Sequence, residues 1–370
     1  MERALARLST RGPRTVTGNH VSRKRRAAHA VLRRLPLIGT LIGLGLAVWL
    51  VATNDLAAVA TAFGRIGFAG FAGVTLVRIL VILLCGLAWA RILDGLPPPA
   101  GPACLILRFV REGINVLLPV ASVGGDVLGA RLLTFWGVAG SLAAASVLAD
   151  LLFQVGTLAL FASLGAGLLS RVQGAEAAAL ASWTLRTLAV AGLVVAAFFA
   201  LQRIGIVRVI EDRLTALGRR FVRETEARPE PPRRIQGALD TVWAPSRRSH
   251  LAQSFVLHAL AWLLGTAEVA VVLACIGVDH VGLADILVIE ALSQAIKAAA
   301  FPVPSGLGVQ EGGLVLVCGL FGIDAGTALA LSLARRVPDV VLGLPALLVW
   351  QNLEARRAGV RPATPSCDNP

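Results

Sequence analysis

The sequence has five cysteines but no CxxC pair, and four of the five lie in or beside apolar segments. This distribution argues against both a disulfide framework and a structural zinc site. The sequence also lacks the features of a cleavable N-terminal signal. About 34 polar, arginine-rich residues precede the first apolar run, and no small-residue cleavage site follows it. We therefore expect the first apolar run to remain in the protein.

The sequence has no recognisable catalytic motif: GxSxG, HExxH and Walker A patterns are all missing. GLGVQEG near residue 306 loosely resembles a nucleotide-binding loop, but no strand–turn–helix pattern surrounds it. DVLGAR (126–131) begins like the lipid alcohol-phosphotransferase signature, yet Val127 replaces its glycine and the later paired aspartates are missing. The histidines lack zinc-type spacing. We therefore predict a protein that is not an enzyme and that has no cofactor and no metal site.

Long apolar runs dominate what is present. The chain of 370 residues is 56% hydrophobic, with a mean hydropathy of +0.75. Runs such as 35–53 and 188–201 approach the length of about 20 residues that a helix needs to cross a bilayer. The sequence therefore predicts an all-α polytopic membrane protein.

The net charge of +13 is concentrated in two segments. Residues 1–34 hold ten Lys and Arg against one acid, and residues 202–252 hold eleven against six. Positive segments of membrane proteins stay in the cytoplasm and contact anionic lipid headgroups, so we prefer this explanation to nucleic-acid binding. It predicts a bacterial inner-membrane protein with both termini in the cytoplasm and no nucleic-acid partner.

The apolar runs and charged segments predict about six spanning helices and a division into two halves. A basic N-terminal tail (1–34), a first membrane half (35–201), a basic cytoplasmic loop (202–252), a second membrane half (253–352) and a cytoplasmic tail (353–370) follow one another. The proline-rich RPEPPRR within the loop would interrupt any helix and divides the halves. The predicted spans are at about 35–53, 66–93, 137–169, 183–201, 254–278 and 325–352, with a periplasmic connection at 54–65.

Two further segments, at about 103–134 and 283–322, must each begin and end on the same side of the membrane. Each contains a glycine–proline break: LLPVASVGGD (117–126) and FPVPSGLGVQE (301–311). Irregular backbone at membrane depth is tolerated only where it is buried in protein or lines a cavity. We therefore predict two re-entrant hairpins. Because they would enter from opposite sides, they suggest an inverted-topology repeat, as in many transporters.

The apolar segments hold seven basic and seven acidic side chains, leaving His258 aside. An unpaired charge at the bilayer centre costs at least about 2.5–3.5 kcal/mol, so the balance predicts ion pairs around a polar interior. Some of these groups also fit a purely structural role. Arg335 and Arg336 fit a salt-bridged kink, Glu268 and Asp150 fit interhelical contacts, and His258 fits a bonded interior histidine. Lys297 stands out because the chain has only two lysines.

The motif RxxREGINVLLPVASVGGDVLGAR (108–131), the segment 301–311 and an arginine at 335 or 336 resemble the flippase-like membrane region of lysylphosphatidylglycerol synthases. Within that superfamily the chain most resembles the hopanoid-biosynthesis-associated membrane proteins. The resemblance covers about 35–352 and implies a lipid-handling domain whose motif residues line the lipid pathway. Asp126 stands where many relatives have glutamate. The chain ends 18 residues after Asn352, without the soluble aminoacyl-transferase domain of the bifunctional synthases, so we do not expect aminoacyl-lipid synthesis.

The leading hypothesis is a translocase or transport factor for a polar-headed lipid, such as a hopanoid or a phospholipid. Arg111, Arg131 and Lys297 would bind the headgroup, and Asp126 and Glu311 would hold these bases. The alternatives are a membrane-embedded transferase with Glu112, Asp126 or Glu311 as base, and a non-transporting partner of lipid-synthesis enzymes. The full set of substrate-binding candidates is Arg78, Arg108, Arg111, Glu112, Asn115, Pro119, Gly124, Gly125, Asp126, Arg131, Asp150, Lys297, Pro302, Pro304, Ser305, Gly306, Gly308, Glu311 and Arg335.

Overall fold

The computed structural model describes residues 56–118, 124–171, 235–299 and 308–360, together with isolated residues between 178 and 200. Every regular element in these ranges is a helix. Within the described residues, three helices are long and apolar enough to cross a membrane: Ala57–Leu93, Gly140–Leu169 and Pro245–Ile276. The chain is therefore an all-α polytopic membrane protein, as the apolar runs predict.

The described helices form two units with the same order of long, short, short and long elements. The first unit contains α2 (Leu56–Leu93), α3 (Gly101–Leu117), α4 (Gly124–Leu133) and α5 (Gly140–Leu169). The second contains α9 (Arg248–Ile276), α10 (Leu283–Ala299), α11 (Val309–Gly319) and α12 (Ala325–Val360). The short helices α3 and α10 each have 17 residues. Each predicted hairpin thus corresponds to a pair of short helices.

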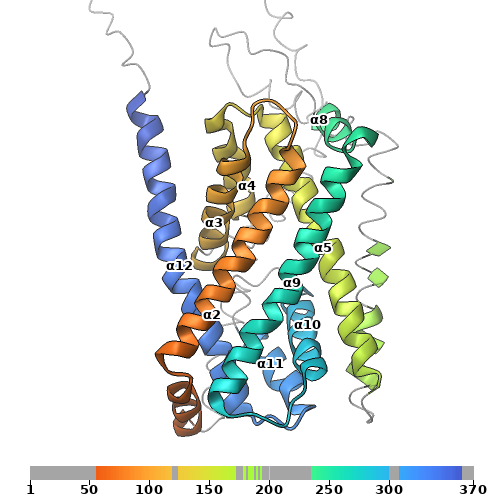
Figure 1. Cartoon of the computed structure of the whole chain (residues 1–370), viewed down its shortest axis with the longest axis vertical. Coiled ribbons are helices and arrows are strands. Elements are labelled where there is room, and N and C mark those ends of the chain that lie inside the picture. The colour runs from red at the N-terminus through yellow and green to blue at the C-terminus, as the bar shows by residue number, and fades with distance from the viewer. Residues whose placement is uncertain are drawn as a thin grey trace, which may run out of the picture.

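Equivalent helices of the two units make equivalent contacts. Within each unit the short helices pack on each other, and the second of them packs on the following long helix. Between the units, α2 packs on α9, α3 on α12, and α10 on α5. Figure 1 shows α3 and α4 in the upper part of the bundle and α10 and α11 at its lower end. This arrangement has the form of an inverted repeat. That the short pairs are re-entrant in a membrane stays a prediction.

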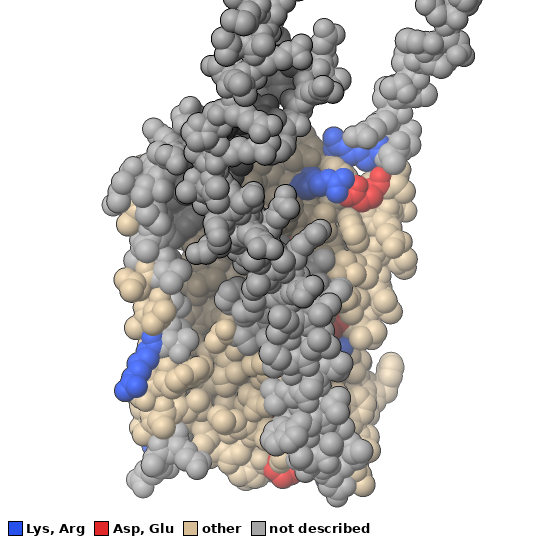
Figure 2. Space-filling view, turned by 180° about the vertical axis from the view of Figure 1, so that it is seen from behind, with Lys and Arg blue, Asp and Glu red and all other residues tan. Residues whose placement is uncertain are grey.

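Small residues bring the helices of different units together. A Cβ at Gly113 of α3 would meet the Ala346 side chain and the Gly343 backbone of α12, and a Cβ at Gly165 of α5 would meet Ala291 of α10. Close approach through small residues is typical of helices in membranes. The outward faces remain apolar, and Figure 2 shows few charged side chains over most of the visible described surface. The bundle therefore exposes apolar side chains on its outer faces and buries most of its interior charges.

Three boundaries differ from the sequence prediction. The predicted connection at 54–65 is helical from Leu56, because nothing breaks the helix until Gly67, whose φ of 61 interrupts its regular geometry. The predicted loop 202–252 contains α8 (Ile235–Val242), a 3-10 turn (Pro245–Arg247) and the first turn of α9, which follow the proline-rich divider. The predicted tail at 353–370 begins inside α12, which continues through Pro338 and Pro345.

The predicted span at 35–53, much of the span at 183–201 and both hairpin tips lie outside the described residues.

The inverted packing predicts that the α2–α3 and α9–α10 connections lie on opposite sides of the membrane. Asp94 and Asp279 are exposed residues of these connections. In a cysteine-free chain, Asp94→Cys should react with an impermeant maleimide from the cytoplasmic side and Asp279→Cys from the periplasmic side. Labelling in vesicles of both orientations measures this. Reaction of both cysteines from one side would contradict the inverted arrangement.

Candidate functional site

A cavity of about 330 Å³ lies between the two units. Its lining comes from α2, α3, α4, α5, α9, α10 and α12, so neither unit forms it alone. Apolar side chains such as Leu151, Leu158 and Trp262 alternate with polar ones. The charged residues and the histidine that line it are Arg78, Arg108, Glu112, Asp126, His258, Glu268, Glu290, Lys297, Arg335 and Asp339. Most of the charges in the apolar segments therefore gather in one place.

The short helices α3 and α10 line the cavity with side chains from the same helix positions. Counted from each first residue, positions 8, 12 and 15 face the cavity, a spacing that places them on one side of a helix. In α3 these positions hold Arg108, Glu112 and Asn115, and in α10 they hold Glu290, Gln294 and Lys297. The two units share the positions but not the charges.

The long helices α5 and α12 repeat this pattern. Position 11 is Asp150 in α5 and Arg335 in α12, and position 15 is Gln154 in α5 and Asp339 in α12. An acid in one unit thus occupies the place of a base in the other. Because opposite charges replace each other at equivalent positions, the inverted backbone has an electrostatically asymmetric interior.

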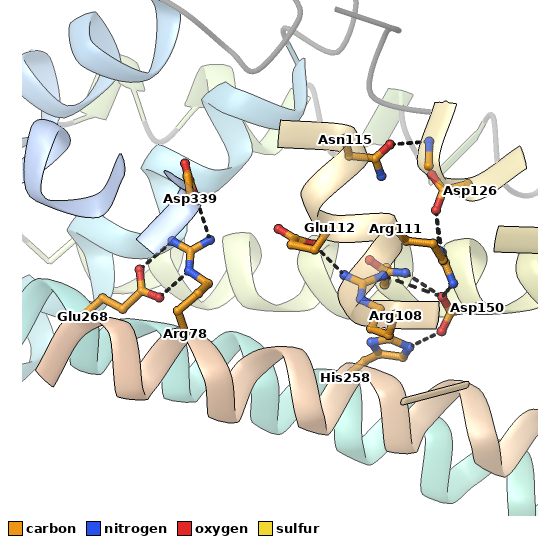
Figure 3. Close-up of polar contacts among 12 residues, drawn as sticks. Arg78, Arg108, Arg111, Glu112, Asn115, Asp126, Asp150, His258, Glu268 and Asp339 are labelled. Carbon is orange, nitrogen blue, oxygen red and sulfur yellow. Dashed lines mark hydrogen bonds and ion pairs between the residues drawn. The ribbon is translucent and has the colours of Figure 1, made fainter. Parts of the chain in front are cut away.

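Arg111 organises the polar residues of the first unit (Figure 3). Its Nε and Nη2 donate to Oδ1 of Asp126 at 2.9 and 2.5 Å, and its Nη1 donates to Oδ2 of Asp150 at 2.9 Å. The Nε2 of His258 lies 2.9 Å from Oδ1 of Asp150. The guanidinium also stacks 4.7 Å above the Trp89 ring. Arg111 and Asp150 are completely buried, so they hold α3, α4, α5 and α9 together behind the cavity wall.

Arg335 organises the polar residues of the second unit, although it lies on a long helix and Arg111 on a short one. Its Nη1 and Nη2 donate to both oxygens of Glu290 at 2.6 and 2.8 Å, and its Nε donates to Glu268 at 3.2 Å. Glu268 also accepts two bonds from Arg78, at 2.7 and 2.8 Å. Asp339 lies 3.8 Å from Arg78 (Figure 3). These bidentate ion pairs join α2, α9, α10 and α12.

Gly125 and Gly129 let α4 approach Arg111 closely. The N–H of Gly125 donates to Oδ1 of Asn115 at 2.8 Å, and a Cβ there would collide with the Arg111 carbonyl oxygen. A Cβ at Gly129 would lie 2.6 Å from Cδ of Arg111. Gly124 and Gly125 begin α4 and place Asp126 in its first turn. These glycines therefore serve the packing that supports the ion pairs.

The structure brings most of the described candidate residues to the cavity or directly behind it. Those that line it are Arg78, Arg108, Glu112, Asn115, Asp126, Lys297 and Arg335. The structure does not bring Arg131 to the cavity, because α4 carries it to the end of the bundle, where its half-exposed side chain pairs with Glu354. Glu311 bonds Arg336 at 2.6 and 2.8 Å and does not line the cavity either. Gly308 is the N-cap of α11, with a φ of 75.

Pro119, Pro302, Pro304, Ser305 and Gly306 lie outside the described residues.

Several cavity residues were missing from the sequence candidates. They are Gln154, Glu268, Glu290, Gln294 and Asp339, together with His258, which the sequence suggested as a bonded interior residue. The sequence pattern could have identified part of this set, since the spacing of Glu290, Gln294 and Lys297 places them on one face of a helix. Among the described residues, no group of three His, Cys, Asp or Glu side chains is arranged to hold a metal.

Comparison with protein families supports the resemblance seen in the motifs. The model of the lysylphosphatidylglycerol synthase TM region matches residues 37–346. This range contains every cavity residue and both helical units except the end of α12. Searches of curated proteins and of solved structures found no match.

Removing Arg335 should strongly destabilise the fold, because Gln294 would be the one described residue still bonded to the buried Glu290. Arg335→Met should lower the free energy of unfolding by about 3–5 kcal/mol, and adding Glu290→Gln should recover part of this loss. Denaturant unfolding in detergent micelles measures both. The exposed pair supplies the control, since Arg131→Met should cost only about 0–1 kcal/mol. Equal losses for the two single variants would refute the central role of Arg335.

A methyl group at Gly125 should separate α4 from α3, because the Arg111 carbonyl cannot move without disturbing its helix. Gly125→Ala should therefore lower the thermal unfolding midpoint in detergent. Gly167→Ala is a matched control in α5, since a Cβ there would meet no atom within 4 Å. A midpoint for Gly125→Ala equal to that of the control would show that this close approach is unnecessary.

Proposed function

The chain belongs to the family of lysylphosphatidylglycerol synthase membrane regions, and on this premise we propose that it moves a polar-headed lipid across the bilayer. The observation that carries the proposal is the charged cavity between two oppositely oriented helical units. A polar headgroup cannot enter hydrocarbon without losing its hydrogen bonds. A cavity lined by charges inside an apolar bundle supplies replacements for those bonds.

The size and lining of the cavity suit a headgroup and not a whole lipid. Its volume of about 330 Å³ is at the lower end of ordinary ligand sites, which run from about 300 to 1,000 Å³. The outer faces of the long helices expose leucines such as Leu76, Leu160 and Leu348. In the proposed mechanism the acyl chains stay against these apolar faces while the headgroup passes through the cavity.

The two short helix pairs provide the proposed gates. In many transporters, one repeat rocks against its inverted partner around a fixed central site. Here α3 contacts α12 and α10 contacts α5, so movement of either short pair alters a contact with the other unit. Alternate loosening of these two contacts would open the cavity first to one leaflet and then to the other.

The proposal also includes the location of the protein, its branch of the superfamily and its partners. We place the protein in the bacterial inner membrane, with the basic segments 1–34 and 202–252 on the cytoplasmic side against anionic headgroups. The motifs favour the hopanoid-associated branch of the superfamily, and lipid-synthesis enzymes are the proposed partners. We propose no chemical step: of the bases that the sequence suggested, Asp126 and Glu311 accept short bonds from arginine, and Glu112 pairs with Arg108.

Purified protein in liposomes containing fluorescent lipid tests the proposal. Wild-type protein should carry labelled lipid between leaflets without changing it chemically. Asp126→Asn and Glu290→Gln should slow this movement about tenfold or more, since each weakens a cavity wall. Glu354→Gln, which alters a carboxylate outside the cavity, should leave the rate unchanged. Covalent conversion of the lipid, or equal rates in all variants, would overturn the proposal.

A further inference from the structure

The cavity contains one cation that no described side chain neutralises. Arg78, Arg108 and Arg335 each form an ion pair with a carboxylate. Lys297 lines the same cavity from α10 and is only partly buried. No hydrogen bond or ion pair joins Lys297 to another residue in the described part of the chain. Its ammonium group is therefore available to a ligand.

Two cavity carboxylates are held much more loosely than the others. Among the described residues, Glu112 has a single ion-pair partner, Arg108 at 3.3 Å, and its side chain is 28% exposed. Asp339 approaches Arg78 no closer than 3.8 Å and is 14% exposed. By contrast, Asp126, Glu268 and Glu290 accept arginine bonds of 2.9 Å or shorter and are at most 6% exposed. Glu112 and Asp339 are thus the most weakly paired of these carboxylates and the most available to a ligand.

These three available charges belong to one space. Lys297, Asp339 and Glu112 all line the cavity, and no hydrogen bond or ion pair between described residues joins Lys297 to either carboxylate. They come from three helices, α10, α12 and α3, that approach the cavity from both units. A ligand between them would meet one cation and two carboxylates at once. A purely anionic group would satisfy Lys297 but face the carboxylates, and a neutral group would satisfy none of them.

We propose that the cavity selects a zwitterionic headgroup that carries one phosphate and one primary ammonium. This inference rests on the proposed lipid transport and names its substrate class. The phosphate binds Lys297, which acts as a compact point charge. The ammonium has three donors and bonds to Glu112 and Asp339 together. Such a headgroup gives Lys297 a partner and adds a cation to Glu112 and Asp339, whose own arginine contacts are long. The shorter arginine bonds of Asp126, Glu268 and Glu290 stay intact.

Transport of two lipids with the same acyl chains tests this selection. Labelled phosphatidylethanolamine carries the phosphate and the ammonium, whereas labelled phosphatidylglycerol carries the phosphate alone. Wild-type protein in liposomes should move phosphatidylethanolamine about tenfold faster than phosphatidylglycerol. Glu112→Gln combined with Asp339→Asn should abolish this preference. Lys297→Gln should slow both lipids, and Lys297→Arg should retain the preference.

The control is Glu354→Gln, whose side chain is 29% exposed, close to the 28% of Glu112, but lies outside the cavity. It should keep the wild-type preference. Lipid retained by the purified proteins, counted by native mass spectrometry from an equimolar mixture, gives a second readout that needs no transport. It also reports only on protein that remains folded.

The outcomes separate the two proposals. If wild-type protein retains phosphatidylethanolamine preferentially but moves no lipid, lipid transport is refuted and the binding site stands. If wild-type protein shows no preference in retention, or the double variant keeps the wild-type preference, the zwitterionic site is refuted. Lipid movement that continues without any preference would leave transport standing and remove the selectivity.

Discussion

The requirement that every buried charge find a partner governs this structure. Arg111 meets it with Asp126 and Asp150, and Arg335 meets it with Glu268 and Glu290. Each arginine thereby ties a short broken helix to long neighbours. A broken helix exposes backbone groups and is poorly held by apolar packing alone, because the surrounding lipid is as apolar as leucine. The ion pairs supply the specific contacts that place the two short pairs.

The same requirement separates supporting charges from available ones. Arginine and carboxylate groups with short bidentate bonds are already satisfied and hold the cavity wall. Lys297, Glu112 and Asp339 lack such bonds and face the enclosed space. The distinction rests on bond geometry and exposure, since all of these residues look equally anomalous as charges in apolar segments. It assigns one group to the scaffold and the other to the proposed ligand.

The two units repeat a backbone arrangement while reversing its chemistry. Arg108 and Glu290 occupy the same helix position, as do Asp150 and Arg335. Arg111 finds its partners within the first unit and Arg335 within the second, whereas Arg78 and Glu268 pair between the units. Opposite charges at equivalent positions therefore still leave each unit with internal ion pairs. They also give the cavity a polarity of its own, which a headgroup with separated charges can match.

Local features of the sequence predicted the fold class and the character of the interior. Hydropathy determined the membrane class, the glycine–proline segments predicted two hairpins that correspond to pairs of short helices, and the balance of charges predicted a paired interior. The tertiary structure decided which charges pair. Arg78 bonds Glu268, 190 positions away, and Arg131 points away from the cavity and pairs with Glu354. The physical reason is helix rotation, about 100° per residue. Arg335 and Arg336 are adjacent in the chain, yet this rotation directs one into the cavity wall and the other to Glu311.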